Sequence, residues 1–194
     1  MSGITSICVY CGSSNSVSEK HLDQATLLGQ QAAEKGIEII YGGGRVGSMG
    51  RVADGALTGN GQVTGIIPEY LQRFEVGHTG VSELVVVDSM HTRKMQMFER
   101  SDAFCILPGG LGTLEEFFEV ATWKQLGMHD KPIILINLEN FWTPLTDLIN
   151  HQIECGYLRQ KPEDIYSVVN SIEEVFVTLE NLPDSRVKPD VTLL

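Results

Sequence analysis

The sequence predicts an α/β protein whose core is a mainly parallel β-sheet with helices on both faces. Short runs rich in β-branched residues alternate with longer amphipathic segments along the whole chain, as repeated β-α units require. Glycine-rich stretches directly follow several of these runs, where β-α turns are expected. The 194 residues, 42% hydrophobic and 20% charged, suffice for one well-buried domain and are few for two.

Seven short apolar runs are the predicted strands. They span Ser6 to Cys11, Glu38 to Tyr41, Gln62 to Ile67, Leu84 to Val87, Ala103 to Leu107, Ile133 to Asn137 and Ile165 to Val169. Seven strands suit a doubly wound, Rossmann-like sheet.

Helical periodicity fills the segments between the strands, with apolar residues every three or four positions. The stripes are Leu22, Ala25, Leu28 and Ala32; Val52, Ala56 and Leu57; Phe117, Val120 and Ala121; and Leu145, Leu148, Ile149 and Ile153. We interpret them as core-facing. We predict a single domain over residues 1–187 and a loose C-terminal tail over residues 188–194.

The acidic composition argues against proteins that bind polyanions. The chain has 14 Lys+Arg against 25 Asp+Glu, which gives a formal charge of −11. We expect no nucleic-acid partner, because phosphate-backbone binding needs a basic surface; a local pocket for one small phosphate is still allowed. No stretch approaches the roughly 18 apolar residues of a membrane span, and Met1 to Ile7 does not resemble a signal peptide. We therefore expect no membrane partner and a cytoplasmic location.

The cysteines do not predict a disulfide scaffold or a metal site. Cys8 and Cys11 form a C-x-x-C inside a predicted strand, where a spacing of three points the side chains to opposite faces. We expect buried or partly buried free thiols there. No second C-x-x-C or histidine pair completes a set of metal ligands, so we expect no bound metal.

Three predicted strands end in small residues. These ends are Cys11 to Ser14, Tyr41 to Gly50 and Pro108 to Glu116. In an open parallel sheet, ligands bind outside the carboxyl ends of the strands. Glycine lets the backbone approach a ligand closely, and a helix that starts there points free N–H groups at it. An anion, most simply a phosphate, fits this arrangement.

The second stretch contains a G-x-G-x-x-G match at Gly42, Gly44 and Gly47. The dinucleotide-binding form of this motif follows the first strand and is answered by an acidic residue about 20 positions later. Here the match follows the second strand, and the nearest acid, Glu69, comes after a proline, so the pattern disfavours a dinucleotide. Glycines needed only for tight turns remain an alternative.

Arg93 and Lys94 stand near the start of a predicted helix, where the helix dipole favours acids. In so acidic a chain, two cations at this place indicate an anionic ligand. The alternative is a pair of solvated charges or of ion-pair partners to Asp88 and Glu99. The nearby His91 is as well explained by a hydrogen bond at the start of the helix as by a catalytic role.

Glu115 and Glu116 open the helix after the third glycine stretch, where carboxylates and Thr113 also suit capping. Successive helical residues differ by about 100°, so the two glutamates cannot point at one ligand in the same way. One can line a site while the other faces solvent or a partner. A carboxylate beside a bound sugar phosphate can orient water or stabilise an oxocarbenium-like centre during glycosidic cleavage.

These motifs resemble those of the LONELY GUY family of cytokinin-activating phosphoribohydrolases, a Rossmann-like group formerly described as lysine decarboxylases. The family's P-G-G-x-G-T-x-x-E stands here as Pro108 to Glu116 and its M-H-x-R-K as Met90 to Lys94. Its Y-G-G-G-x-V-G-x-M-G stands as Tyr41 to Gly50 and its C-G-S-S as Cys11 to Ser14. The resemblance runs from about Ile7 to Tyr157.

The resemblance implies hydrolysis of the N-glycosidic bond of a nucleoside 5′-monophosphate, which releases the free base and ribose 5-phosphate without a cofactor. The family prefers adenine nucleotides with an isoprenoid group, and some members also cleave AMP. The catalytic residues fall on Arg93 and Glu116. The substrate-binding residues fall on Ser13, Gly43, Gly44, Glu75, Lys94, Gly109, Gly110, Leu111, Gly112, Thr113, Leu114, Glu115 and Thr122. Family members are dimers or larger, which implies a homodimer with its site near the interface.

Two other functions remain open from the residues. The first is a nucleotide-binding carrier or sensor with the same fold and no turnover. The second is a pyridoxal phosphate decarboxylase, which needs a Schiff-base lysine; nothing marks Lys94, Lys124 or Lys131 as that lysine.

The preferred base is not determined by the sequence. Leu111 stands where the family commonly has a tyrosine, and so it supplies no phenol hydroxyl. The candidates for an apolar pocket are Met90, Met97, Phe98 and Trp123, each of which also suits core packing.

Overall fold

The computed structural model of the chain describes residues 3–75 and 77–181, with the side chains of residues 73–75 excluded. The predicted domain boundary at residue 187 and the predicted tail over residues 188–194 lie outside the described residues.

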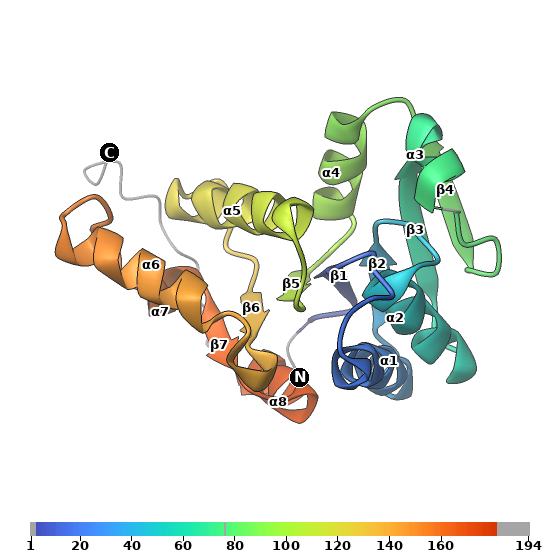
Figure 1. The fold of residues 1–194 in the computed structure, drawn as a ribbon, viewed down its shortest axis with the longest axis horizontal. Helices are drawn as coiled ribbons and strands as arrows, with labels where there is room; N and C mark the ends of the chain where they lie inside the picture. Colours follow the sequence, from blue (N-terminus) through green and yellow to red (C-terminus); the bar gives the residue numbers. More distant parts are fainter. Residues whose placement is uncertain (1–2, 76, 182–194) are drawn as a thin grey trace.

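A seven-stranded sheet forms the centre of the molecule (Figure 1). The strands are β1 (Ser6–Tyr10), β2 (Glu38–Tyr41), β3 (Val63–Pro68), β4 (Glu83–Val87), β5 (Ala103–Ile106), β6 (Ile133–Ile136) and β7 (Ser167–Val169). Their order is β4-β3-β2-β1-β5-β6-β7, and neighbouring strands are parallel throughout. The predicted doubly wound α/β fold is confirmed.

Every predicted strand is present, with small differences at the ends. The seventh begins at Ser167 rather than Ile165, because Pro162 starts a single helical turn, α7 (Pro162–Ile165). Proline has the fixed φ of a first helical residue, and its missing N–H costs nothing there. Cys11, Leu107 and Asn137 leave the sheet at its carboxyl edge.

Helices cover both faces of the sheet (Figure 1). One core packs α1 (Glu19–Glu34), α2 (Gly47–Thr58) and α8 (Ile172–Asn181) on the sheet. The opposite core holds α4 (Met90–Glu99), α5 (Leu111–Gln125), α6 (Thr143–Glu154) and α7. The helix α3 (Glu69–Glu75) follows β3, and a 3-10 turn, η1 (Leu138–Asn140), follows β6. No helix in residues 3–75 and 77–181 is long and apolar enough to cross a membrane.

The predicted helical stripes face the core with one clear exception. All four members of the α1 stripe are buried. In α6, Leu145 and Ile149 are buried, but Leu148 is 51% exposed. The position of Leu148 was therefore predicted wrongly: it lies about 100° around the helix from Ile149, beyond the buried stripe.

The cysteines lie as expected. Cys8 and Cys11 are buried in the two different cores, on opposite faces of the sheet, and none of the four cysteines forms a disulfide bond. Burial raises the pKa of the Cys105 thiol to about 12 and that of Cys8 well above its ordinary value. At neutral pH these two thiols are protonated and unreactive.

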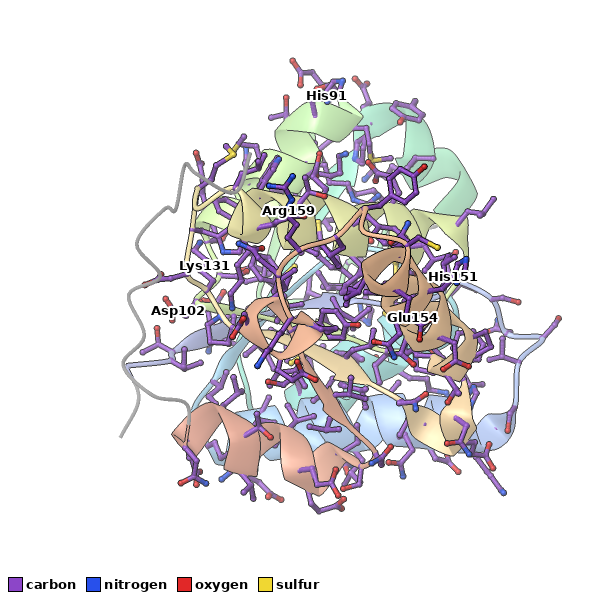
Figure 2. The ribbon with its side chains drawn as sticks, turned by 90° about the vertical axis from the view of Figure 1, so that its left-hand side faces the viewer. His91, Asp102, Lys131, His151, Glu154 and Arg159 are labelled. Atoms are coloured by element: carbon purple, nitrogen blue, oxygen red, sulfur yellow. The ribbon has the colours of Figure 1, made fainter. Side chains whose placement is uncertain are left out.

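The start of β1 is tied to the start of β5 by Asp102, which is labelled in Figure 2. The Asp102 carboxylate accepts hydrogen bonds from the Thr5 and Ser6 main-chain N–H groups at 2.8 and 3.0 Å, and from the Thr5 hydroxyl at 2.9 Å. Partial burial works to raise the pKa of Asp102, but these hydrogen bonds outweigh it and the pKa lies below the ordinary 3.8.

We predict that Asp102→Asn lowers the free energy of unfolding by about 2 kcal/mol at pH 7, because charge-assisted hydrogen bonds are lost. A depressed folded-state pKa stabilises the fold above the unfolded pKa, and this stabilisation is lost as the pH falls through the folded pKa. The difference between wild type and variant should therefore shrink below about pH 4 in urea denaturation. Asp147→Asn, at an exposed carboxylate on α6, is the control and should change little at either pH. A difference that stays constant down to pH 2.5 would contradict the assignment.

Candidate functional site

A cleft of about 610 Å³ opens at the carboxyl ends of β1 and β5. The chain leaves these adjacent strands toward opposite sides of the sheet, and the Gly12 N–H donates to the Pro108 carbonyl at 3.2 Å across the cleft floor. The lining residues are Cys11, Gly12, Ser13, Ser14, Val17, His21, Ser48, Met49, Leu71, Met90, Arg93, Pro108, Gly109, Gly110, Leu111, Gly112, Thr113, Glu116 and Phe141. The first and third glycine-rich stretches thus meet where ligands bind in this fold.

The N-terminus of α5 opens into this cleft. Gly110 is the N-cap and provides no side-chain cap, so Thr113, at the third helical position, does not cap the helix. Glu115 and Glu116 lie beyond the first turn and do not cap it either. The first N–H groups of α5 and the positive end of its dipole therefore face the cleft with no side-chain partner among the described residues.

The glycines before and within α5 differ in what requires them. A Cβ on Gly109 would lie 2.1 Å from the Thr113 hydroxyl oxygen, so close packing requires glycine there. A Cβ on Gly110 or Gly112 would meet nothing within 4 Å, and neither residue has a positive φ. Both glycines line the cleft, and the open space beside them lets the backbone approach a ligand closely.

Arg93 projects from α4 to the cleft and is only 4% exposed. Its Nε donates to the Ile66 carbonyl at 3.1 Å, and its Nη2 donates to the Gly42 carbonyl at 3.0 Å. Its Nη1 lies 3.4 Å from the Met90 sulfur. A Cβ on Gly42 would stand 2.0 Å from Nη2, so glycine at position 42 is what allows the guanidinium this position.

Gly43 and Gly44 serve the packing of the second glycine stretch and do not line the cleft. Gly43 has a φ of +78° and lies tightly against Ile66, and Gly44 forms an isolated β-bridge with Gly77. These contacts agree with the alternative in which the two glycines serve a tight turn. Ser48 and Met49, later in the same stretch, do line the cleft.

The two glutamates of α5 take different directions, as the helical spacing predicts. Glu116 is 8% exposed and lines the cleft. Its negative charge adds to the effect of burial in raising the pKa of the Tyr10 hydroxyl. Glu115 lies outside the cleft, where its carboxylate pairs with Lys94.

Lys94 is buried between α4 and α5. Its ammonium lies 2.5 Å from the Glu115 carboxylate and 2.9 Å from that of Glu119. Burial alone lowers the pKa of Lys94, but the hydrogen bonds and charges of the two glutamates outweigh it and the pKa is raised. The predicted alternative partners, Asp88 and Glu99, are not its partners among the described ion pairs, and Lys94 does not line the cleft.

The other predicted site residues are divided between the cleft and the surface. Ser13 and Leu111 line the cleft, whereas Leu114 packs against the core that includes α5. Thr122 is exposed two turns further along α5, and Glu75 is the last residue of α3, with its side chain outside the described part. Figure 2 shows His91 at the outer end of α4, where it is exposed and away from the cleft lining.

The sequence gives little signal for the cleft's apolar wall. Val17, Leu71 and Phe141 line the cleft, and the Phe141 ring stands edge-on to His21 with 5.8 Å between ring centroids. They belong to no motif, because they come from separate connections that only the fold brings together. Of the four predicted apolar candidates only Met90 lines the cleft; Met97 is buried, and Phe98 packs edge-on against Trp123. Within residues 3–75 and 77–181 no group of three or more His, Cys, Asp or Glu could hold a metal ion.

We predict that Lys94→Met lowers the free energy of unfolding by about 2 kcal/mol, because two carboxylates lose the ammonium between them. Urea denaturation at pH 7 measures this. Lys20→Met is the matched control, since the Lys20 ammonium also pairs with a glutamate, Glu139, but on the open surface; it should leave stability unchanged. Equal effects of the two substitutions would show that the buried position of Lys94 adds nothing.

Comparisons with known proteins agree with this architecture. Residues 49–179 match the family model described as possible lysine decarboxylase. The chain is 40% identical over 174 residues to the probable cytokinin riboside 5′-monophosphate phosphoribohydrolase LOGL2 of Oryza sativa subsp. japonica. The aligned region covers 90% of this chain and 71% of that protein. It is 40% identical over 175 residues to the cytokinin riboside 5′-monophosphate phosphoribohydrolase LOG1 of Arabidopsis thaliana, over 90% and 82% of the two chains.

The fold extends to more distant proteins. The Moco carrier protein from Chlamydomonas reinhardtii superposes with a TM-score of 0.69 at 19% identity, over 91% of this chain and 96% of that chain. Identity this low shows a shared fold alone. The match to the family model and the 40% identity to the plant proteins over most of their length go further, and the chain belongs to the LONELY GUY family.

Proposed function

We propose that this protein hydrolyses the N-glycosidic bond of nucleoside 5′-monophosphates, such as isopentenyl-AMP and AMP, to the free base and ribose 5-phosphate. One observation carries the proposal: a buried guanidinium, Arg93, and a buried carboxylate, Glu116, line the same cleft as the uncapped N-terminus of α5. The relatives named above as cytokinin riboside 5′-monophosphate phosphoribohydrolases support the same reaction.

The 5′-phosphate binds at the N-terminus of α5. Main-chain N–H groups from Gly110 to Thr113 and the helix dipole favour a dianion there. The empty space beside Gly110 and Gly112 supports this placement, since no protein atom uses it. In this proposal Ser13 contacts the phosphate from the opposite wall. Gly43 and Gly44 contribute by shaping the backbone, and Lys94 and Glu115 by an ion pair that joins α4 to α5 outside the cleft lining. Leu114, Thr122 and Glu75, which the family resemblance also implies, stay predicted substrate-binding residues.

Glu116 and Arg93 act on the ribose. The bond between C1′ and the base nitrogen breaks, an oxocarbenium-like ribose develops positive charge, and water adds to C1′. Glu116 takes the proton of that water or stabilises the ribosyl cation. The hydroxyl of the water bonds to C1′, and the proton that the water loses balances the one that the leaving base takes up from solvent. Arg93 binds the phosphate or ribose and holds it in place for attack.

The cleft offers nothing for pyridoxal chemistry in the described residues. A Schiff base needs a lysine facing the cofactor. Lys94 is held by Glu115 and Glu119, and the ammonium groups of Lys124 and Lys131 donate to main-chain carbonyls. None of these three lysines lines the cleft, which supports the hydrolase over the decarboxylase that the family model's description suggests.

In our proposal the chain acts as a cytoplasmic homodimer built from single domains over residues 1–187, with its site near the subunit interface. The outer face of α5 supports this, because Phe118 is 40% exposed and Leu111, at the cleft mouth, is 85% exposed. The two side chains stand seven residues apart, about two helical turns, and so lie on one face of α5; a contiguous exposed apolar surface marks an interaction site. Sedimentation of the purified chain measures the assembly.

The reaction is tested by incubating the protein with AMP and with isopentenyl-AMP and separating the products by chromatography. We expect free base and ribose 5-phosphate from wild type, and a loss of kcat of at least about a hundredfold in Glu116→Gln, which keeps the shape of the side chain but cannot accept a proton. Arg93→Ala should lose a similar factor. Near-wild-type turnover by Glu116→Gln would disprove its assigned role. Nucleotide binding by wild type without product release would indicate a carrier or sensor.

Gly112→Ala separates ligand binding from folding. The added methyl group meets no protein atom and stands in helical backbone, so the variant should be as stable as wild type or more stable by about 0.5 kcal/mol. The same methyl group enters the proposed phosphate site, and we expect KM for AMP to rise by about tenfold or more. The measurements are thermal unfolding and steady-state kinetics. Gly36→Ala is the contrasting variant. Gly36 has a φ of +68°, which alanine adopts only with strain, and it does not line the cleft, so this substitution should lower stability and leave KM unchanged. An unchanged KM in Gly112→Ala would show that the phosphate does not bind beside Gly112.

A further inference from the structure

The orientation of the Arg93 side chain depends on two main-chain carbonyls. An arginine side chain has several rotatable bonds, and its guanidinium is aimed only if its donors are held. Nε is held by the Ile66 carbonyl in β3, and Nη2 by the Gly42 carbonyl just after β2. The first acceptor belongs to a strand inside the sheet. The second belongs to a loop, and so its position needs a separate support.

That support comes from the segment at residues 77–80. The His78 N–H donates to the Gly43 carbonyl at 2.9 Å, and Gly77 forms an isolated β-bridge with Gly44. Gly43 adopts a φ of +78°, and its conformation sets the plane of the peptide that contains the Gly42 carbonyl. The acceptor of Arg93 is therefore fixed from behind by contacts outside the cleft.

The His78 side chain anchors this segment to α2. It is only 5% exposed, and it does not line the cleft. The Gly80 N–H donates to Nδ1 at 3.1 Å, so the proton lies on Nε2, which donates to the Asp54 carboxylate at 2.9 Å. Both ring nitrogens are thus used in joining one loop to a neighbouring helix.

We propose that His78 is a positioning residue, which holds the loop after β2 so that the Gly42 carbonyl directs the Arg93 guanidinium into the cleft. The proposal rests on the proposed function, because it concerns the efficiency of the reaction in which Arg93 takes part. His78 touches no substrate. Its effect travels from the imidazole to Gly43, then to the Gly42 carbonyl and then to Arg93.

A double-mutant cycle tests the proposal through kcat/KM for AMP. Wild type, His78→Ala, Arg93→Ala and the double variant are compared, with long incubations at high enzyme concentration for the slow forms. A misplaced catalytic group costs about ten- to a hundredfold, and we expect that loss from His78→Ala when Arg93 is present. In the Arg93→Ala background the same substitution should cost less than about twofold, because nothing is left to position.

Two further variants separate positioning from general damage to the fold. His78→Gln, whose amide nitrogen can reach Asp54 as Nε2 does, should restore most of kcat/KM. His129 is the matched control: its Nδ1 also accepts from the N–H two residues later, and its Nε2 contacts a main-chain carbonyl, but it lies away from the cleft. His129→Ala should lower the melting temperature and change kcat/KM by the same factor with and without Arg93.

The outcomes are distinct. If wild type releases base and His78→Ala costs the same factor in both Arg93 backgrounds, the positioning role is wrong and the proposed function stands. A wild type that binds AMP and releases no base overturns both. If His78→Gln loses as much activity as His78→Ala, and circular dichroism shows that both variants are folded, the proposal is also wrong.

Discussion

The reversal of the chain between β1 and β5 is the constraint on which the site depends. Connections from β1 run toward β2 and those from β5 run toward β6, so no connection crosses the gap between the carboxyl ends of these two strands. Because a parallel sheet points the carboxyl ends of all its strands to one edge, this gap receives the first and third glycine-rich stretches and the N-terminus of α5. The main-chain N–H groups that face the cleft from α5 therefore follow from the topology, whereas the guanidinium depends on Arg93 and on glycine at position 42.

The glycines around the cleft show how packing and ligand space are divided. Gly42 and Gly109 are required by neighbouring atoms, the Arg93 guanidinium and the Thr113 hydroxyl, which occupy the places of their missing Cβ atoms. Gly110 and Gly112 have no such neighbour. Sequence treats these glycines alike, since each stands in a glycine-rich turn. The fold decides which glycine makes room for a neighbouring protein atom and which leaves open space that a ligand can occupy.

The sequence predicted the fold well because parallel strands buried on both faces are continuous apolar runs, and all seven were located within two residues of their starts. It also predicted the polar part of the cleft, because glycine loops and an Arg-Lys pair are local patterns. The apolar wall was not predictable in this way. Phe141 reaches the cleft through a connection in which Glu139 and Asn140 both have positive φ. Asparagine often adopts that conformation, but glutamate seldom does, so Glu139 gives no local signal of it. Nor does any local pattern reveal that Lys94 meets Glu119, since the contact joins two helices.

On both α4 and α5, one of two adjacent charged residues lines the cleft and the other takes part in an ion pair between the two helices. Since consecutive helical residues point about 100° apart, a helix that turns Arg93 toward the sheet edge must turn Lys94 toward a neighbour. That neighbour is α5, whose Glu115 and Glu119 lie one turn apart and both reach the Lys94 ammonium. The same rotation on α5 leaves Glu116 facing the cleft. Lys94 is therefore neutralised locally by carboxylates, whereas Arg93 is held by uncharged carbonyls and keeps its positive field for the cleft. In a chain with a net charge of −11, Arg93 is the one lysine or arginine among the described residues that line the cleft, and so it offers an anionic ligand a positive charge there.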